Sequence, residues 1–176
     1  MTDVYQGLRE HLDNLPAGFP PTENGVEIRI LKQLFTPEEA QMAQLLGLKL
    51  EHAAAIAKRA GMPADQAAEL LKTMSRKGLI FSIETGDRPP AYMASPFVVG
   101  IWEYHVNQLT PEFIKDTDEY FPTLMQEVFG HLPQLRTIPV EKSIDAGTRI
   151  LAHETAEELV KQQKKFLVAP CICRKE

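Results

Sequence analysis

The two cysteines of the chain, Cys171 and Cys173, are the residues whose type and spacing point most directly to chemistry. In an extended or turning loop, residues separated by one position can direct both thiolates toward one metal centre, while backbone N–H groups donate to the sulfurs. A tetrahedral sulfur site or an iron–sulfur cluster needs four ligands. The pair is therefore expected to be the first half of a ligand set that residues beyond Glu176 complete.

The spacing of the two cysteines alone leaves other interpretations open. Two ordinary buried thiols are common in proteins, and a disulfide across one intervening residue is sterically allowed but strained. Four nearby cations would stabilise the negative charge of a cluster: Lys164, Lys165, Arg174 and Lys175.

Composition describes an ordinary globular chain of 176 residues, with 44% hydrophobic residues, 24% charged residues and a formal net charge of −5. The acidic balance argues against a dedicated nucleic-acid binder. No apolar run approaches the roughly 18 residues of a membrane span, and the start lacks the pattern of a secretory signal. Two cysteines indicate no disulfide framework, so a cytoplasmic location is expected.

The element that should organise the middle of the chain is a winged helix-turn-helix over residues 36–94. Thr36-Pro37-Glu38-Glu39 is a capping box with proline at the first helical position. Three helices and then a β-hairpin follow in the order of that motif. The expected segments are helices over 36–47, 51–60 and 63–78 and strands over 79–83 and 91–93.

Three further segments flank this domain. Residues 1–35 predict a short helix, a Pro/Gly arm anchored by Leu15 and Phe19, and a second helix after Gly25. Residues 95–130 predict a helix capped by Ser95-Pro96 and another from Thr110 that Pro122 kinks or restarts. Residues 131–176 predict a truncated α+β segment: an extended stretch over 135–140, a helix over 154–163 and a buried strand over 166–169. The fold class is thus mainly α with a small β component.

A winged helix raises the question of DNA binding. The exposed basic residues of the domain are Lys58, Arg59, Lys72, Arg76, Lys77 and Arg88, and the candidates for DNA contact are Lys72, Arg76, Lys77 and Arg88. Residues 63–66, which would face DNA at the start of the third helix, include one carboxylate and no cation, whereas each phosphate contact needs a cation. The charge distribution therefore favours a protein-contact role.

No set of residues indicates catalysis. The five histidines show no paired metal spacing, and neither a phosphate loop nor a nucleophile elbow is present. Trp102, Tyr104 and His105 are interpreted as core, since an aromatic stripe at helical spacing usually packs inward. The acidic run Glu112, Asp116, Asp118 and Glu119 is interpreted as a solvated helix face. An electron carrier or accessory subunit is favoured over an enzyme.

The segment Phe166-Leu167-Val168-Ala169-Pro170-Cys171-Ile172-Cys173-Arg174 resembles a stretch of 4Fe-4S ferredoxin-type proteins of anaerobic bacteria that carry an N-terminal winged-helix region. Residues 8–13, 29–32, 34–40, 97–103 and 134–140 are similar too, so the resemblance spans nearly the whole chain. It implies that Cys171 and Cys173 are cluster ligands and that further cysteines follow in the full-length protein.

The sequence therefore predicts the N-terminal portion of an iron–sulfur electron-transfer protein. This portion would serve docking or regulation, with a redox protein as partner and no cluster of its own. One alternative is a regulator in which the cluster senses redox state and the winged helix binds DNA. The other is a metal-free protein-interaction module. A homo-oligomer is compatible with each.

Overall fold

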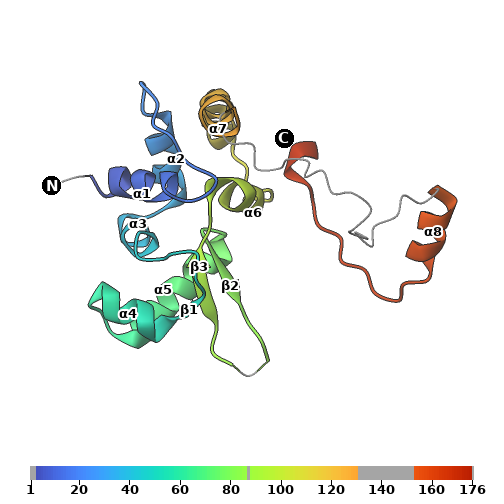
Figure 1. Cartoon of the computed structure of the whole chain (residues 1–176), viewed down its shortest axis with the longest axis horizontal. Helices are drawn as coiled ribbons and strands as arrows, with labels where there is room; N and C mark the ends of the chain where they lie inside the picture. Colours follow the sequence, from blue (N-terminus) through green and yellow to red (C-terminus); the bar gives the residue numbers. More distant parts are fainter. Residues whose placement is uncertain (1–2, 87, 131–152, 176) are drawn as a thin grey trace, which may run out of the picture.

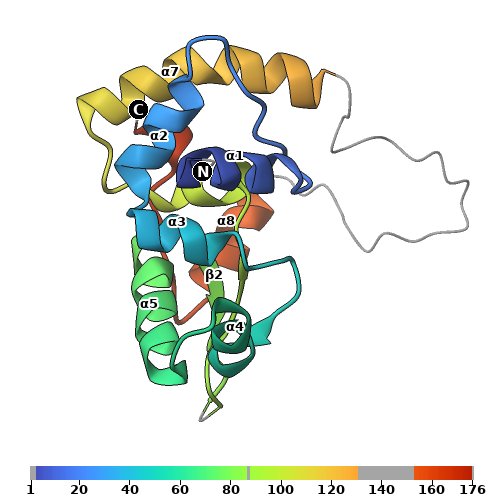
Figure 2. The same cartoon turned by 90° about the vertical axis from the view of Figure 1, so that its left-hand side faces the viewer.

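The computed structural model describes residues 3–86, 88–130 and 153–175. It is mainly helical with a small three-stranded antiparallel sheet, as the sequence predicts. Helices α1 (Val4–Asp13), α2 (Val26–Leu34) and α7 (Pro111–Leu124) pack together at one end of the molecule, and the sheet and its helices occupy the other end (Figure 1). A view at right angles shows the same division (Figure 2).

The second half is built from α3 (Pro37–Ala43), β1 (Glu51–His52), α4 (Ala53–Ala60), α5 (Ala64–Lys77), β2 (Ile80–Ile83) and β3 (Ala91–Ala94). The strands lie in the order β1-β3-β2, and β2 pairs with β3 from Ile80 opposite Ala94 to Ile83 opposite Ala91. This succession of helices and strands, with a central third strand, is the arrangement of a winged helix-turn-helix.

Local signals account for most of these boundaries. The Thr36 hydroxyl accepts from the backbone N–H of Glu39, and the Glu39 carboxylate accepts from the backbone N–H of Thr36, so the predicted capping box is confirmed. Helix α5 ends at Gly78, whose positive φ of 81° suits the left-handed cap that glycine favours. A side chain at Gly78 would also overlap Tyr104.

The first two residues of the predicted helix 51–60 form strand β1 instead, so that boundary was wrong. Glu51 lies opposite Tyr92 and His52 opposite Ala91, on the edge of β3 that β2 leaves free. Pairing with this edge satisfies backbone groups that a first helical turn would leave unpaired. The Arg59 guanidinium holds the Glu51 carboxylate at 2.7 Å and ties the strand to α4.

The predicted helix from Ser95 is also wrong over its first half. Residues Phe97–Ile101 form a turn, η1, in which Val98 has extended backbone angles, and helix α6 covers only Trp102–Tyr104. The backbone N–H of Gly100 donates to the Glu103 carboxylate at 2.6 Å rather than to a helical carbonyl. A side chain at Gly100 would overlap the Ser95 hydroxyl, which would have to rotate away.

Helix α7 neither ends nor restarts at Pro122. It passes through the proline to Leu124 and continues as the π-type turn η2 (Met125–Phe129). Pro122 removes one helical N–H donor, and the wider turn follows within one helical turn of it.

The core joins the two halves through aromatic packing. Phe19, on the Pro/Gly arm, lies 4.8 Å from Tyr120 of α7 and 4.9 Å from Phe97, measured between ring centroids. The buried Tyr120 hydroxyl donates to the carbonyl of Pro20 at 3.0 Å. Phe19 and Leu15 are both buried, which confirms them as the anchors of the arm.

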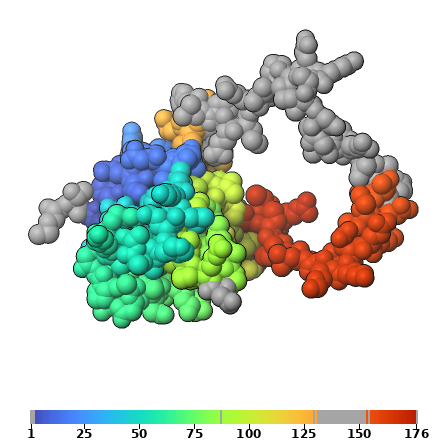
Figure 3. Space-filling model, turned by 60° about the horizontal axis from the view of Figure 1, so that its bottom comes forward, coloured from blue at the N-terminus to red at the C-terminus, as the bar shows by residue number. Residues whose placement is uncertain are grey.

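The C-terminal part contains helix α8 (His153–Lys161) and an extended segment that leads to the turn η3 (Ile172–Arg174). The predicted buried strand over 166–169 is wrong: Phe166, Leu167 and Val168 are 63%, 97% and 89% exposed. No strand within the described ranges pairs with them, so their backbone has no ladder to join. Figure 3 shows the segment extending from the body of the molecule. The predicted stretch 135–140 lies outside the described residues.

Candidate functional site

The turn that carries the two cysteines has an alternating pattern of exposure. Cys171 and Cys173 are exposed and not joined in a disulfide, whereas Ile172 between them is only 4% exposed. Cys171 has extended backbone angles, and η3 closes behind it through a hydrogen bond from the Arg174 N–H to the Cys171 carbonyl at 3.1 Å. The thiols are therefore presented to solvent while the residue between them is held inward.

Contacts on either side of the thiols hold the turn to the helical body. The Lys175 ammonium donates to Asn107 Oδ1 at 2.9 Å, just beyond α6. Upstream, Ala169 and Pro170 line a pocket together with Tyr104 and Asn107. Burial of Ile172 adds about 2 kcal/mol of hydrophobic stabilisation. The cysteine pair thus sits on the folded body, although the arm before it is exposed.

The two thiols match the ligand type of an iron–sulfur cluster but supply only half of the ligand number. Within residues 3–86, 88–130 and 153–175, no group of three or more His, Cys, Asp or Glu side chains is placed to hold a metal. The flanking cations Lys164, Lys165, Arg174 and Lys175 are all exposed. The described residues therefore fit a ligand pair and do not form a complete metal site.

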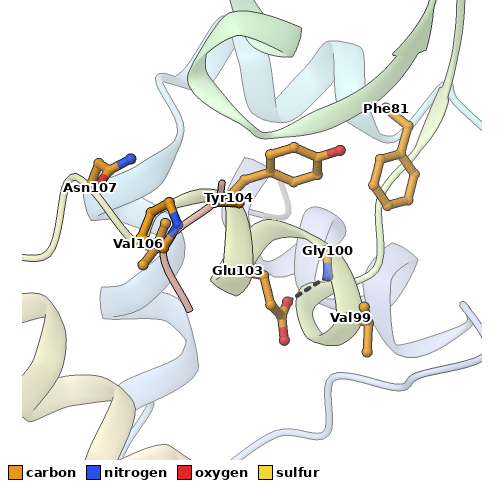
Figure 4. A pocket seen from close by; sticks show the side chains of 9 residues that line it. Phe81, Val99, Gly100, Glu103, Tyr104, Val106 and Asn107 are labelled. Atoms are coloured by element: carbon orange, nitrogen blue, oxygen red, sulfur yellow. Dashed lines mark hydrogen bonds between the residues drawn. The ribbon is translucent and has the colours of Figure 1, made fainter. Parts of the chain in front are cut away.

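An apolar pocket of about 460 Å³ adjoins this turn (Figure 4). Its walls come from β2, from η1 and α6, and from the extended segment before Cys171. The residues that line it are Phe81, Val99, Gly100, Glu103, Tyr104, Val106, Asn107, Ala169 and Pro170. The sequence alone does not reveal this pocket, because its lining residues come from three separate segments, with Phe81 and Pro170 more than 80 residues apart. The helix predicted from Ser95 would also have placed Val99 and Gly100 differently.

The basic residues predicted for DNA contact separate into two groups. Lys72 and Arg76 of α5 and Arg88 of the hairpin surround one concavity of about 520 Å³, together with Glu69 and Glu84. Lys77 lies elsewhere: its ammonium is 2.8 Å from both carboxylate oxygens of the buried Glu39. Lys77 therefore joins α5 to α3.

The acidic run on α7 is only partly a solvated face, so that interpretation needs correction. Asp116 is buried, and its carboxylate accepts from the Arg29 guanidinium at 2.9 Å and from the Gln33 amide at 2.7 Å. Both partners come from α2. Asp118 and Glu119 remain exposed. No local signal separates Asp116 from its neighbours, because its partners lie more than 80 residues away.

The aromatic and histidine residues near α6 behave as core for the most part. Trp102 is 3% exposed and packs on Phe113 and Phe121, with ring centroids 5.3 and 5.5 Å away. His105 is buried, and its Nδ1–H donates to the Ile101 carbonyl at 2.7 Å. Burial, followed by the nearby Lys77 charge, lowers the pKa of His105. Tyr104 is the exception, since it is exposed and faces the apolar pocket.

No model of a known protein family matches the chain, and no curated protein shows significant similarity to it. In the part of the chain that the structure describes, no helix is both long and apolar enough to cross a membrane.

Proposed function

We propose that this chain is the docking or regulatory region of a 4Fe-4S electron-transfer protein, and that Cys171 and Cys173 are two of the ligands of the cluster. The observation that carries the proposal is the alternation of exposed Cys171, buried Ile172 and exposed Cys173. A turn anchored through its middle residue leaves both thiols exposed to solvent at little entropic cost, as a ligand pair requires.

The remaining ligands of such a cluster must come from outside these 176 residues, because the sequence contains two cysteines. When bound, a cluster supplies one-electron transfer and needs no protein acid or base. The role of this chain is then to hold the thiols beside an exposed, largely apolar pocket and to provide a folded surface for a redox partner.

A set of single substitutions tests the ligand assignment in the protein made with every residue that its gene encodes and purified without oxygen. Cys171→Ala and Cys173→Ala should each lower the iron content, because a cluster that loses a thiolate becomes labile. Thr73→Ala is the matched control, since it removes a small polar side chain that is exposed on α5 and should leave iron unchanged. Iron content that stays the same in both cysteine variants would overturn the assignment.

A DNA-binding regulator is the second candidate, favoured by one observation. Lys72, Arg76 and Arg88 gather around one concavity between α5 and the hairpin, and none of them forms an ion pair with another described residue. Opposing it, Glu69 and Glu84 line the same concavity, and residues 64–71 at the start of α5 include no cation.

A salt titration separates the two candidates. If the concavity binds DNA, affinity for duplex DNA should fall steeply as salt rises, and a triple alanine variant of Lys72, Arg76 and Arg88 should reduce the salt slope by about three. The triple variant of Lys32, Lys115 and Lys161, which changes exposed lysines outside the winged helix, should keep the slope. Absence of binding at low salt would eliminate the regulator.

A further inference from the structure

The apolar pocket beside the cysteine turn has the size of a small-molecule site. Its volume of about 460 Å³ lies within the range of roughly 300–1,000 Å³ that such sites occupy. Three separate parts of the chain form it: strand β2, the turn leading into α6, and residues 169–170. Figure 4 shows the Phe81, Val99 and Tyr104 side chains around the same space.

The walls favour a flat apolar body. Phe81 and Tyr104 meet edge to face, with ring centroids 5.7 Å apart, and Val106 and Pro170 add aliphatic surface. Val99 and Tyr104 are 68% and 54% exposed although both are large and apolar in body. A ligand that covers them removes this surface from water and gains hydrophobic free energy.

One carboxylate lies among the residues that line the pocket. Glu103 is the only ionisable acid or base other than Tyr104 among the residues lining the pocket, and one oxygen of its carboxylate accepts from the Gly100 N–H at 2.6 Å. No described cation forms an ion pair with it. The second polar side chain, Asn107, already accepts from Lys175. A carboxylate that forms no ion pair, in a wall that is otherwise largely apolar, attracts a cationic group. The Lys175 ammonium reaches the same pocket but is bound to Asn107.

We propose that this pocket binds a small molecule with a flat apolar body and a protonated amine, the amine paired with Glu103 and the body held between Tyr104, Phe81 and Pro170. Because Ala169 and Pro170 form one wall, the ligand also contacts the segment that leads to Cys171. Binding therefore stabilises the docked position of that segment by linkage. The proposal holds whether or not the cysteines bind metal.

Three probes that share one ring system and differ in charge test the site: naphthylethylamine, naphthylethanol and naphthylacetate. Their binding to the 176-residue chain is followed near pH 7 by ligand-observed NMR. The amine should bind saturably, with a Kd on the order of 0.1–1 mM for a ligand of this size. It should bind about three- to tenfold more tightly than the alcohol, and the acetate should bind most weakly.

Four variants locate the binding. Glu103→Gln keeps an acceptor for the Gly100 N–H, removes the charge, and should bring the amine to the affinity of the alcohol. Ala169→Trp fills the pocket from an exposed position and should weaken all three probes about tenfold or more. Ala169→Trp could push residues 169–170 away from the body without filling the pocket. Val99→Trp covers that case, because it fills the pocket from a different segment and should weaken all three probes as well. Glu112→Gln removes an exposed carboxylate on α7 and should change nothing.

Two kinds of result would overturn the proposal. The first is an absence of saturable binding by any of the probes to the unmodified chain. The second is binding at another place on the chain. It would show as a preference for the amine that is unchanged in Glu103→Gln, or as affinities that are unchanged in both tryptophan variants while circular dichroism shows an intact fold. Either result leaves the cluster proposal untouched, since that proposal is tested by iron content.

Discussion

At the scale of single residues, burial decides which polar side chains are structural. His105 shows this most clearly, because it is buried at the end of α6 and faces Lys77 at the end of α5. Burial and the Lys77 charge disfavour the imidazolium and lower the pKa of His105 from its ordinary value of 6.5. His11 is shifted in the same direction, also by burial.

These two histidines predict a loss of stability on mild acidification. Above pH 6.5 both the folded and the unfolded chain hold them neutral, so their contribution is complete. As the pH falls below 6.5, the unfolded chain takes up protons first, and the free energy of unfolding decreases. Urea unfolding at about pH 7.5 and about pH 5.5 should show this decrease.

Histidine substitutions test whether His11 and His105 cause the pH effect. His105→Gln should reduce the difference between the two pH values, and the double variant His11→Gln/His105→Gln should reduce it further. The variant His52→Gln changes an exposed histidine and should leave the difference as it is. A pH difference that persists unchanged in the double variant would contradict this assignment.

At the scale of elements, the sequence predicts a helix boundary correctly where the residues that set the boundary lie next to it in the chain. The capping box at Thr36 and the glycine end of α5 at Gly78 both lie within one turn of the boundary that they set. Strand β1 was missed because its determinant is the free edge of β3, about 40 residues away. The strand predicted over 166–169 is wrong because the segment has the apolar residues of a strand but no neighbouring strand with which to pair.

The same reasoning explains which parts of the candidate sites were found. Cys171 and Cys173 could be singled out because their spacing is a local property. The pocket could not, because Phe81, Tyr104 and Pro170 meet only in the folded chain. Asp116 was taken as solvated because a helical acid shows no sequence sign of a distant Arg29.

The ion pair between Arg29 of α2 and Asp116 of α7 should stabilise the packing of these two helices. Asp116→Ala leaves the Gln33 amide without its acceptor and leaves the Arg29 guanidinium only its ion pair with Glu119 at 3.2 Å, so it should cost about 1–3 kcal/mol of unfolding free energy. Urea denaturation measures it. Asp118→Ala removes an exposed carboxylate from the same helix and should stay within about 0.5 kcal/mol. Equal effects of the two variants would mean that Asp116 does not join the helices.

At the scale of the whole molecule, three surfaces lie on one compact body. The α5–hairpin concavity lies within the winged helix, and the apolar pocket lies where the winged helix meets α6. Ile172 of the cysteine turn is buried, and Lys175 binds Asn107 in the chain that follows α6. If the proposed function holds, a redox partner that reaches the thiols also meets the rim of the apolar pocket.

The most direct measurement is the amount of iron and acid-labile sulfide in the protein made with every residue that its gene encodes and purified under anaerobic conditions. If Cys171 and Cys173 are cluster ligands, we expect about four of each per cluster, with broad visible absorbance that bleaches on reduction. Protein that is folded but carries neither iron nor sulfide, and that does not take them up on anaerobic reconstitution, would contradict the assignment of Cys171 and Cys173.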